Sequence, residues 1–188
     1  LFNMINVLIL VWFIKPYTNF INWLFPDNRY QSGSGFKFIS TGILSTSELS
    51  MIQVRKEVKS FADQSVKMFD LTKKLYATTN KNEIENIFND LQLMEKQMDK
   101  TEVDIASYLS RLSEKDLSII ASRRIRSLLK ISDNVESIAD NCYNLGKIIK
   151  RKSDNRIWFT PELRSQVNEM FKHLDKSFEI MKSNFIAE

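Results

Sequence analysis

Glycine and proline are scarce in this chain of 188 residues, which has four and three of them. Sandwiches and barrels of many short strands need frequent turn residues, so the composition excludes such folds and favours long helices. Cysteine occurs once, at Cys142, and histidine once, at His173. A single cysteine excludes an internal disulfide and is typical of a reducing compartment. One thiol and one imidazole also exclude a closed zinc site within the chain, so any bound metal depends on oxygen ligands.

A concentrated basic surface is also missing. The net charge is only +4, and basic residues alternate with acidic ones except in the short cluster Arg123, Arg124 and Arg126. Because nucleic-acid-binding proteins usually show a basic face, we expect no nucleic acid among the partners. The sequence also has no glycine-rich phosphate loop and no nucleophile elbow, and His173 has no evident nucleophile beside it. We therefore predict that the protein is not an enzyme and has no catalytic residues.

The long apolar run is confined to the N-terminal part. Twelve of residues 1–14 are apolar and none is charged. As a helix they would span about 21 Å, less than the roughly 30 Å of a bilayer core, but the chain begins with Leu and we expect residues upstream of it. Trp12, Tyr17 and Trp23 are types that favour the membrane–water boundary.

We interpret residues 1–26 as the end of a membrane domain, with a partial transmembrane and interfacial helix. The alternative is a hydrophobic arm packed on the soluble part. Residues 27–44 contain the sequence SGSG and are expected to be a linker.

Four long helices are predicted in residues 45–188. Start signals occur at Ser45, Asn80, Ser113 and Thr160, the last followed by Pro161. Apolar or small residues then recur in steps of three and four, which predicts an all-α antiparallel bundle with short connections. The recurring positions are Val58, Phe61, Ser65, Met68, Thr72 and Leu75; Ile84, Ile87, Leu91, Met94, Met98, Thr101 and Ile105; Leu128, Ile131, Val135, Ile138, Cys142, Leu145 and Ile149; and Leu163, Val167, Met170, Leu174, Phe178, Met181 and Phe185.

Two of these helices carry a glutamate followed four residues later by an aspartate. Residues four apart share one face of a helix, and each pair lies at about 100° and 140° from a residue of the apolar seam, Met94 on one helix and Val135 on the other, so the acids face away from the seam. Neighbouring helices can therefore bring four carboxylates to one outer groove, where Mg²⁺, Ca²⁺, Mn²⁺ or iron would find oxygen ligands. The alternative is an ordinary solvated acidic surface. The candidate metal ligands are Glu95, Asp99, Glu136 and Asp140, with Glu102 and Asp133 as secondary candidates.

Several segments resemble the C-terminal PhoU-like region of bacterial sodium/phosphate cotransporter family proteins. Besides the two E-x-x-x-D pairs, they are FISTGILSTSE at 38–48, VRKEV at 54–58, RRIRSLLKI at 123–131 and IWFTPEL at 157–163. The segment FNMIN at 2–6 and the apolar run after it are similar to a late transmembrane segment of that family.

The resemblance implies a PhoU-like fold of three-helix repeats, which bind multinuclear clusters of divalent metal or iron on an outer face. Residues 45–188 would hold one three-helix repeat and the first helix of a second. The implied function is that of a cytosolic regulatory and metal-binding region of a sodium-dependent phosphate symporter of the inner membrane. The transport core of the family is not in this sequence, so sodium and phosphate sites have no counterpart here.

The expected partners are the protein's own upstream membrane domain, sodium and inorganic phosphate through that domain, and a second copy of the chain in a homo-oligomer. Two alternatives stay open. One is a phosphate-signalling PhoU-like adaptor without transport activity, and the other is a metal-free helical oligomerisation module.

Overall fold

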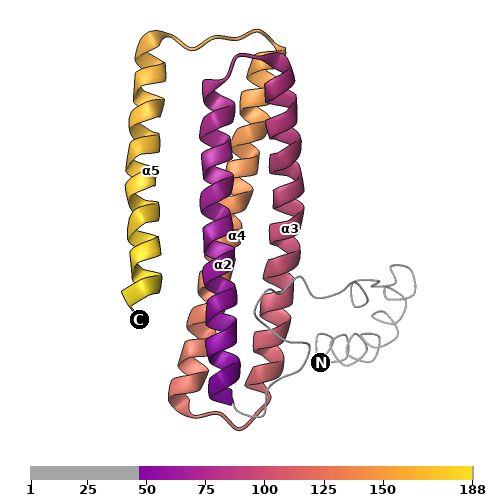
Figure 1. The fold of residues 1–188 in the computed structure, drawn as a ribbon, viewed down its shortest axis with the longest axis vertical. Helices are drawn as coiled ribbons and strands as arrows, with labels where there is room; N and C mark the ends of the chain where they lie inside the picture. The colour runs from indigo at the N-terminus through magenta and orange to yellow at the C-terminus, as the bar shows by residue number, and fades with distance from the viewer. Residues whose placement is uncertain (1–46, 188) are drawn as a thin grey trace, which may run out of the picture. The chain divides into compact units, whose positions relative to one another are not determined.

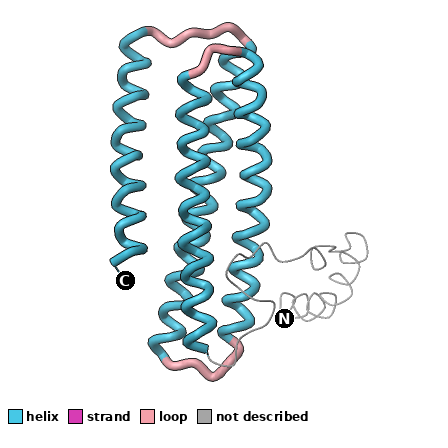
Figure 2. The backbone as a smooth tube through the Cα atoms, viewed as in Figure 1, coloured by secondary structure: helices cyan, strands magenta, loops and turns pink. Residues whose placement is uncertain are grey.

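The computed structural model describes residues 47–187 of the chain. They form four α-helices, and no strand occurs among them (Figures 1 and 2). The helices are α2 (Ser47–Ala77), α3 (Lys81–Ser113), α4 (Ile119–Asp154) and α5 (Pro161–Ala187). The predicted all-α antiparallel bundle is thus confirmed. The proposed membrane segment and linker lie outside the described residues, and none of the helices in 47–187 is long and apolar enough to cross a bilayer.

Side-chain caps explain where the helices start. The Asn80 side chain accepts hydrogen bonds from the N–H groups of Asn82 and Glu83, which fixes the start of α3. Ser118, and not Ser113, caps α4 by accepting from the N–H of Ala121 at 3.1 Å. The prediction for Ser113 was wrong because α3 continues to that residue, and residues 114–118 are then needed to reverse the chain.

Helices α2, α3 and α4 pack against one another in all three pairs and enclose a continuous core. Most of the positions predicted from the apolar period are buried. They include Val58, Phe61, Met68, Leu75, Leu91, Met98, Ile105, Val135, Cys142 and Ile149. The steps of three and four therefore identified the correct face of α2 and α3, because each of these helices has at least two neighbours to cover its apolar stripe.

Small residues take a larger part in the core face of α4 than the apolar period suggested. Ser132, Ala139 and Gly146 are buried at intervals of seven residues, whereas the expected Ile138 and Leu145 lie at its edge, partly buried. A Cβ atom on Gly146 would lie 3.0 Å from the Cδ1 atom of Leu91. These small residues let the backbone of α4 come close to its neighbours.

Helix α5 contacts α2 alone among the described helices (Figure 1). The ring centroids of Phe171 and Phe178 lie 5.8 and 4.8 Å from that of Phe69. Lys73 of α2 pairs with Asp175 of α5. The prediction that Met170 belongs to the core was wrong, since its side chain is 63% exposed.

The exposure of Met170 has a simple geometric cause. Packing on a single helix buries only a narrow stripe of α5, and the neighbouring Phe171 occupies that stripe. Leu163 and Leu174, which were also expected in the seam, are exposed for the same reason.

Candidate metal centre

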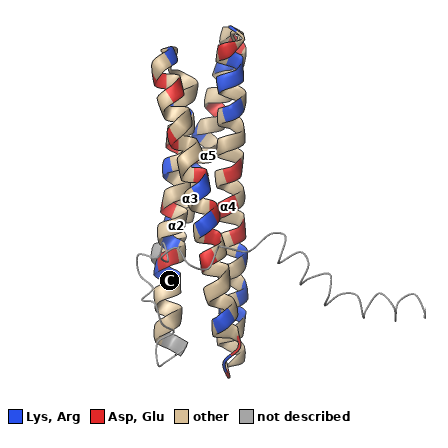
Figure 3. Cartoon of the chain, turned by 90° about the vertical axis from the view of Figure 1, so that its right-hand side faces the viewer, with Lys and Arg blue, Asp and Glu red and all other residues tan. Residues whose placement is uncertain are grey.

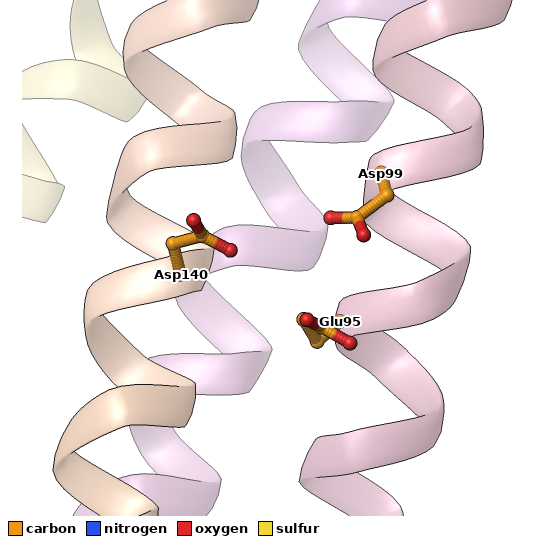
Figure 4. A group of neighbouring side chains, drawn as sticks. All are labelled: Glu95, Asp99 and Asp140. Carbon is orange, nitrogen blue, oxygen red and sulfur yellow. The ribbon is translucent and has the colours of Figure 1, made fainter.

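Three of the predicted ligands converge in the groove between α3 and α4. Glu95 and Asp99 project from α3 toward Asp140 on α4 (Figure 4). One carboxylate oxygen from each of the three lies within 4.8 Å of the other two. The local sequence places each E-x-x-x-D pair on one face of its helix, and the packing of α3 against α4 brings three of the four carboxylates together.

We call Glu95, Asp99 and Asp140 the close group. The other three predicted ligands, Glu136, Glu102 and Asp133, lie outside it on the same two helices. Partial burial and then the charges of Asp140, Asp99 and Glu102 raise the pKa of Glu136. The pKa of Glu102 is raised by partial burial and next by Asp133. In both cases acidic neighbours on α3 and on α4 contribute. We call the six predicted residues of these two helices the acidic row, and Figure 3 shows acidic residues along both helices.

Partial burial and mutual repulsion also act inside the close group. Burial first, and then Asp99 and Asp140, raise the pKa of Glu95. Burial and Asp140 likewise raise the pKa of Asp99. Both shifts have the same meaning, because a raised carboxyl pKa reports that the ionised form is unfavourable in its surroundings. A bound cation would remove that cost by neutralising the charge.

The spacing of the three carboxylates is compatible with one ion. Metal–oxygen distances of about 2.1–2.5 Å allow two oxygens on opposite sides of an ion to lie roughly 4–5 Å apart. The 4.8 Å limit on the three oxygens therefore fits a shared ion without movement of the helices. Oxygen donors alone favour Mg²⁺, Ca²⁺, Mn²⁺ or iron over softer metals. Water molecules would complete the coordination shell, since three ligand atoms are too few for these ions.

One residue near the site was missed in the sequence. Lys147 lies seven residues after Asp140, so it occupies the same face of α4, and its charge acts to lower the pKa of Glu95. Its ammonium group lies 4.5 Å from the centroid of the Tyr143 ring. The Tyr143 hydroxyl in turn accepts a hydrogen bond from Gln92 at 3.2 Å. The seven-residue spacing from Asp140 is the signal that would have identified Lys147.

The single cysteine and the single histidine do not belong to the candidate metal site. Burial raises the pKa of the Cys142 thiol to about 11, so the thiol stays protonated near neutral pH and is a poor metal ligand. His173 lies exposed on α5. The oxygen ligands of α3 and α4 are therefore the donors that any metal would use among the described residues.

The described residues form an all-helical bundle with an acidic surface between two long antiparallel helices. Comparison with known families is more specific, because residues 58–149 match the model of the PhoU domain. This segment runs from α2 to near the end of α4 and contains all six candidate ligands. No curated protein and no solved structure matches the chain.

Residues 58–149 are thus similar to the PhoU domain, a phosphate-related regulatory helical domain. PhoU domains are regulatory and not catalytic, which is consistent with our expectation that the protein is not an enzyme. The match ends before α5, so it leaves that helix without a family counterpart.

Proposed function

We propose that this chain is the C-terminal regulatory region of a sodium-dependent phosphate cotransporter and that its PhoU domain binds a divalent metal or iron between α3 and α4. The metal part of the proposal is carried by one observation, the convergence of Glu95, Asp99 and Asp140. The transporter part is supported by the resemblance of residues 38–48, 123–131 and 157–163 to that family, together with the PhoU domain.

The proposed metal acts by joining two helices. Glu95 and Asp99 belong to α3 and Asp140 belongs to α4, so one ion would hold both helices at a fixed separation. Glu136, Glu102 and Asp133 add further negative charge on the same two helices. The occupancy of the site would then act as a signal, because an ion that joins α3 to α4 stabilises the packing of these two helices.

Metal binding is tested on the full chain purified in detergent. We expect elemental analysis to find bound Mn, Fe or Mg, and we expect the melting temperature to rise when Mn²⁺ is added after chelation. The substitutions D99N and D140N should each abolish most of this rise, because each removes one ligand charge from the close group. The matched control is D90N, which changes an exposed aspartate elsewhere on α3. A chelated chain whose melting temperature responds to none of Mn²⁺, Fe²⁺, Mg²⁺ and Ca²⁺ would overturn the metal proposal.

The transporter proposal needs a separate experiment. The protein encoded by the complete reading frame is reconstituted in vesicles, and uptake of inorganic phosphate is measured with and without a sodium gradient. Sodium-dependent uptake is the expected result. A folded protein that takes up no phosphate under a gradient would support the signalling-adaptor alternative instead, and it would leave the metal proposal unaffected.

A further inference from the structure

The connection between α4 and α5 exposes two large apolar side chains in succession. Ile157 is 53% and Trp158 64% exposed. The next residue, Phe159, is partly buried, with its ring centroid 6.1 Å from that of Tyr76 and 4.2 Å from the ammonium group of Lys152. The loop is therefore held to the bundle by Phe159, at the end of the helices where α4 stops and α5 starts (Figure 1). We call the pair Ile157 and Trp158 the apolar tip.

The backbone before the tip is ordered by a Schellman motif. The N–H of Arg156 donates to the carbonyl of Ser153 at 2.9 Å, and the N–H of Ile157 donates to the carbonyl of Lys152 at 3.0 Å. Arg156 has a φ of 55°, a conformation in which glycine is the usual residue. The apolar residue at the position of Ile157 commonly packs against a residue one turn earlier, but Arg151 and Lys152 stand there. Ile157 therefore stays exposed in a fixed position.

Positive charge surrounds the tip. Residues 147–164 contain six basic and only two acidic residues. Lys150 is paired with Glu85 and Asp154. No ion pair involves Arg151, Arg156 or Arg164 within the part of the chain that the structure describes, and all three are exposed. The result is an apolar tip with unpaired arginines on both sides of it in the sequence.

We propose that the apolar tip docks on the surface of an anionic phospholipid bilayer. Tryptophan favours the interfacial layer of a membrane, and arginine side chains bind the phosphates of lipid headgroups. Ile157 and Trp158 would enter the interface, while Arg151, Arg156 and Arg164 would contact the headgroups. This inference goes beyond the proposed function, because neither metal binding nor control of transport requires the PhoU domain to touch lipid.

Charge and position favour a bilayer over other partners. The net charge of the segment matches anionic headgroups, and a tip at the end of two helices meets a flat surface without needing a socket in its partner. An RNA or DNA partner would call for a wider basic face than three arginines provide. A protein partner stays an outcome of the test.

The test uses the full chain with the substitutions W12F and W23F, which leave Trp158 as the sole tryptophan. The chain is added to vesicles of phosphatidylcholine alone or with phosphatidylglycerol. We expect the emission of Trp158 to shift to shorter wavelength when the vesicles are added. We also expect brominated acyl chains to quench this emission, with roughly threefold more quenching in the anionic vesicles. Residues 1–26 are present in both samples, so any anchoring by them does not produce the difference.

Two double variants distinguish the effect of the arginines near the tip from the effect of the net charge of the protein. R151Q with R156Q should remove the preference for anionic vesicles, whereas R123Q with R124Q removes the same charge at the start of α4 and should preserve it. An equal loss of the preference for anionic vesicles in both double variants would overturn the proposal. So would the absence of quenching of Trp158 by brominated lipids in both kinds of vesicle. A Trp158 shielded from acrylamide in a self-associated chain without lipid would overturn it too, in favour of a protein contact. Far-UV circular dichroism confirms that each variant is folded.

Discussion

Arg156 shows how one residue can be placed against its own conformational preference. It is the single non-glycine residue with positive φ within residues 47–187. The left-handed conformation costs an L-residue with a Cβ atom roughly 1–2 kcal/mol. An arginine at this position therefore carries a conformational cost that glycine would avoid.

Replacing Arg156 with glycine should stabilise the protein. We expect R156G to raise the free energy of unfolding by about 1 kcal/mol, because glycine adopts positive φ without a Cβ clash. Urea unfolding of the full chain, followed by circular dichroism, measures the change. The control is R156A, which also removes the charge but keeps the Cβ atom, and it should bring no comparable gain. An equal gain in R156A would show that the side chain, and not the backbone, is responsible.

For individual residues of the candidate metal site, the sequence predicted which acidic side chains share a surface but not which of them come close to one another. Two carboxylates four residues apart must share a helix face, so the pairs at Glu95 and Glu136 followed from helical geometry alone. Glu95, Asp99 and Asp140 approach within 4.8 Å, and Glu136 stays outside this group. This difference depends on the axial register of α3 against α4 and on side-chain rotamers. Neither quantity is fixed by spacing within one helix.

At the scale of whole helices, the close approach of α4 depends on Gly146. The substitution G146V should destabilise the bundle by about 1–3 kcal/mol, because the added methyl groups enter space filled by Leu91 and Leu75. Urea unfolding measures the effect. A matched control is I148V, a change on the exposed side of the same helix, which should cost far less. A G146V chain as stable as the wild type would show that the packing of α4 against α2 and α3 adapts without cost.

Helix α5 should open more readily than the rest of the bundle. Within residues 47–187 it packs on α2 alone. An apolar groove of about 380 Å³, lined by residues that include Ile138, Leu145 and Leu174, separates it from α4. Few buried contacts mean a low free energy of local opening. Hydrogen exchange should therefore be faster in α5 than in α2, α3 and α4.

The substitution F171A sharpens this prediction. Removing the ring that contacts Phe69 and Tyr76 should cost about 2 kcal/mol of local stability, which corresponds to roughly 30-fold faster exchange in α5. The control is H173A, which changes an exposed residue of the same helix and should leave exchange unchanged. Uniform acceleration over all four helices after F171A would show instead that α5 is an integral part of the bundle.

The differences between predicted and observed elements have physical causes. The apolar period gave the core faces of α2 and α3 because both helices are covered by two or more neighbours. It failed for Met170 because the period alone does not reveal how many neighbours a helix has. It underrated Ser132 and Gly146 because small residues carry no apolar signal, although they decide how closely helices approach. It misplaced the cap of α4 because Ser113 and Ser118 are both plausible caps.

For the molecule as a whole, we expect the acidic residues of α3 and α4 to make the stability of the fold depend on pH, and on metal where the proposed site is loaded. Glu95, Asp99, Glu102 and Glu136 have raised pKa values in the folded chain. Each of them therefore binds protons more readily when folded than when unfolded. Its contribution to stability is complete below the ordinary carboxyl pKa of about 4 and is lost as the pH rises through the raised folded value.

The chelated full chain should accordingly become more stable as the pH falls from 7 toward about 4, when measured relative to the double variant E95Q with D99N. Mn²⁺ should reverse this trend, because the metal binds the ionised carboxylates and protons compete with it. Thermal unfolding over this pH range, with EDTA or Mn²⁺, measures both slopes. D90N should keep both wild-type slopes, since Asp90 lies outside the row. Identical pH slopes in the wild type and the double variant, with and without Mn²⁺, would mean that the carboxylates of the groove act as independent solvated charges. In that case the convergence of α3 and α4 would have no consequence for regulation.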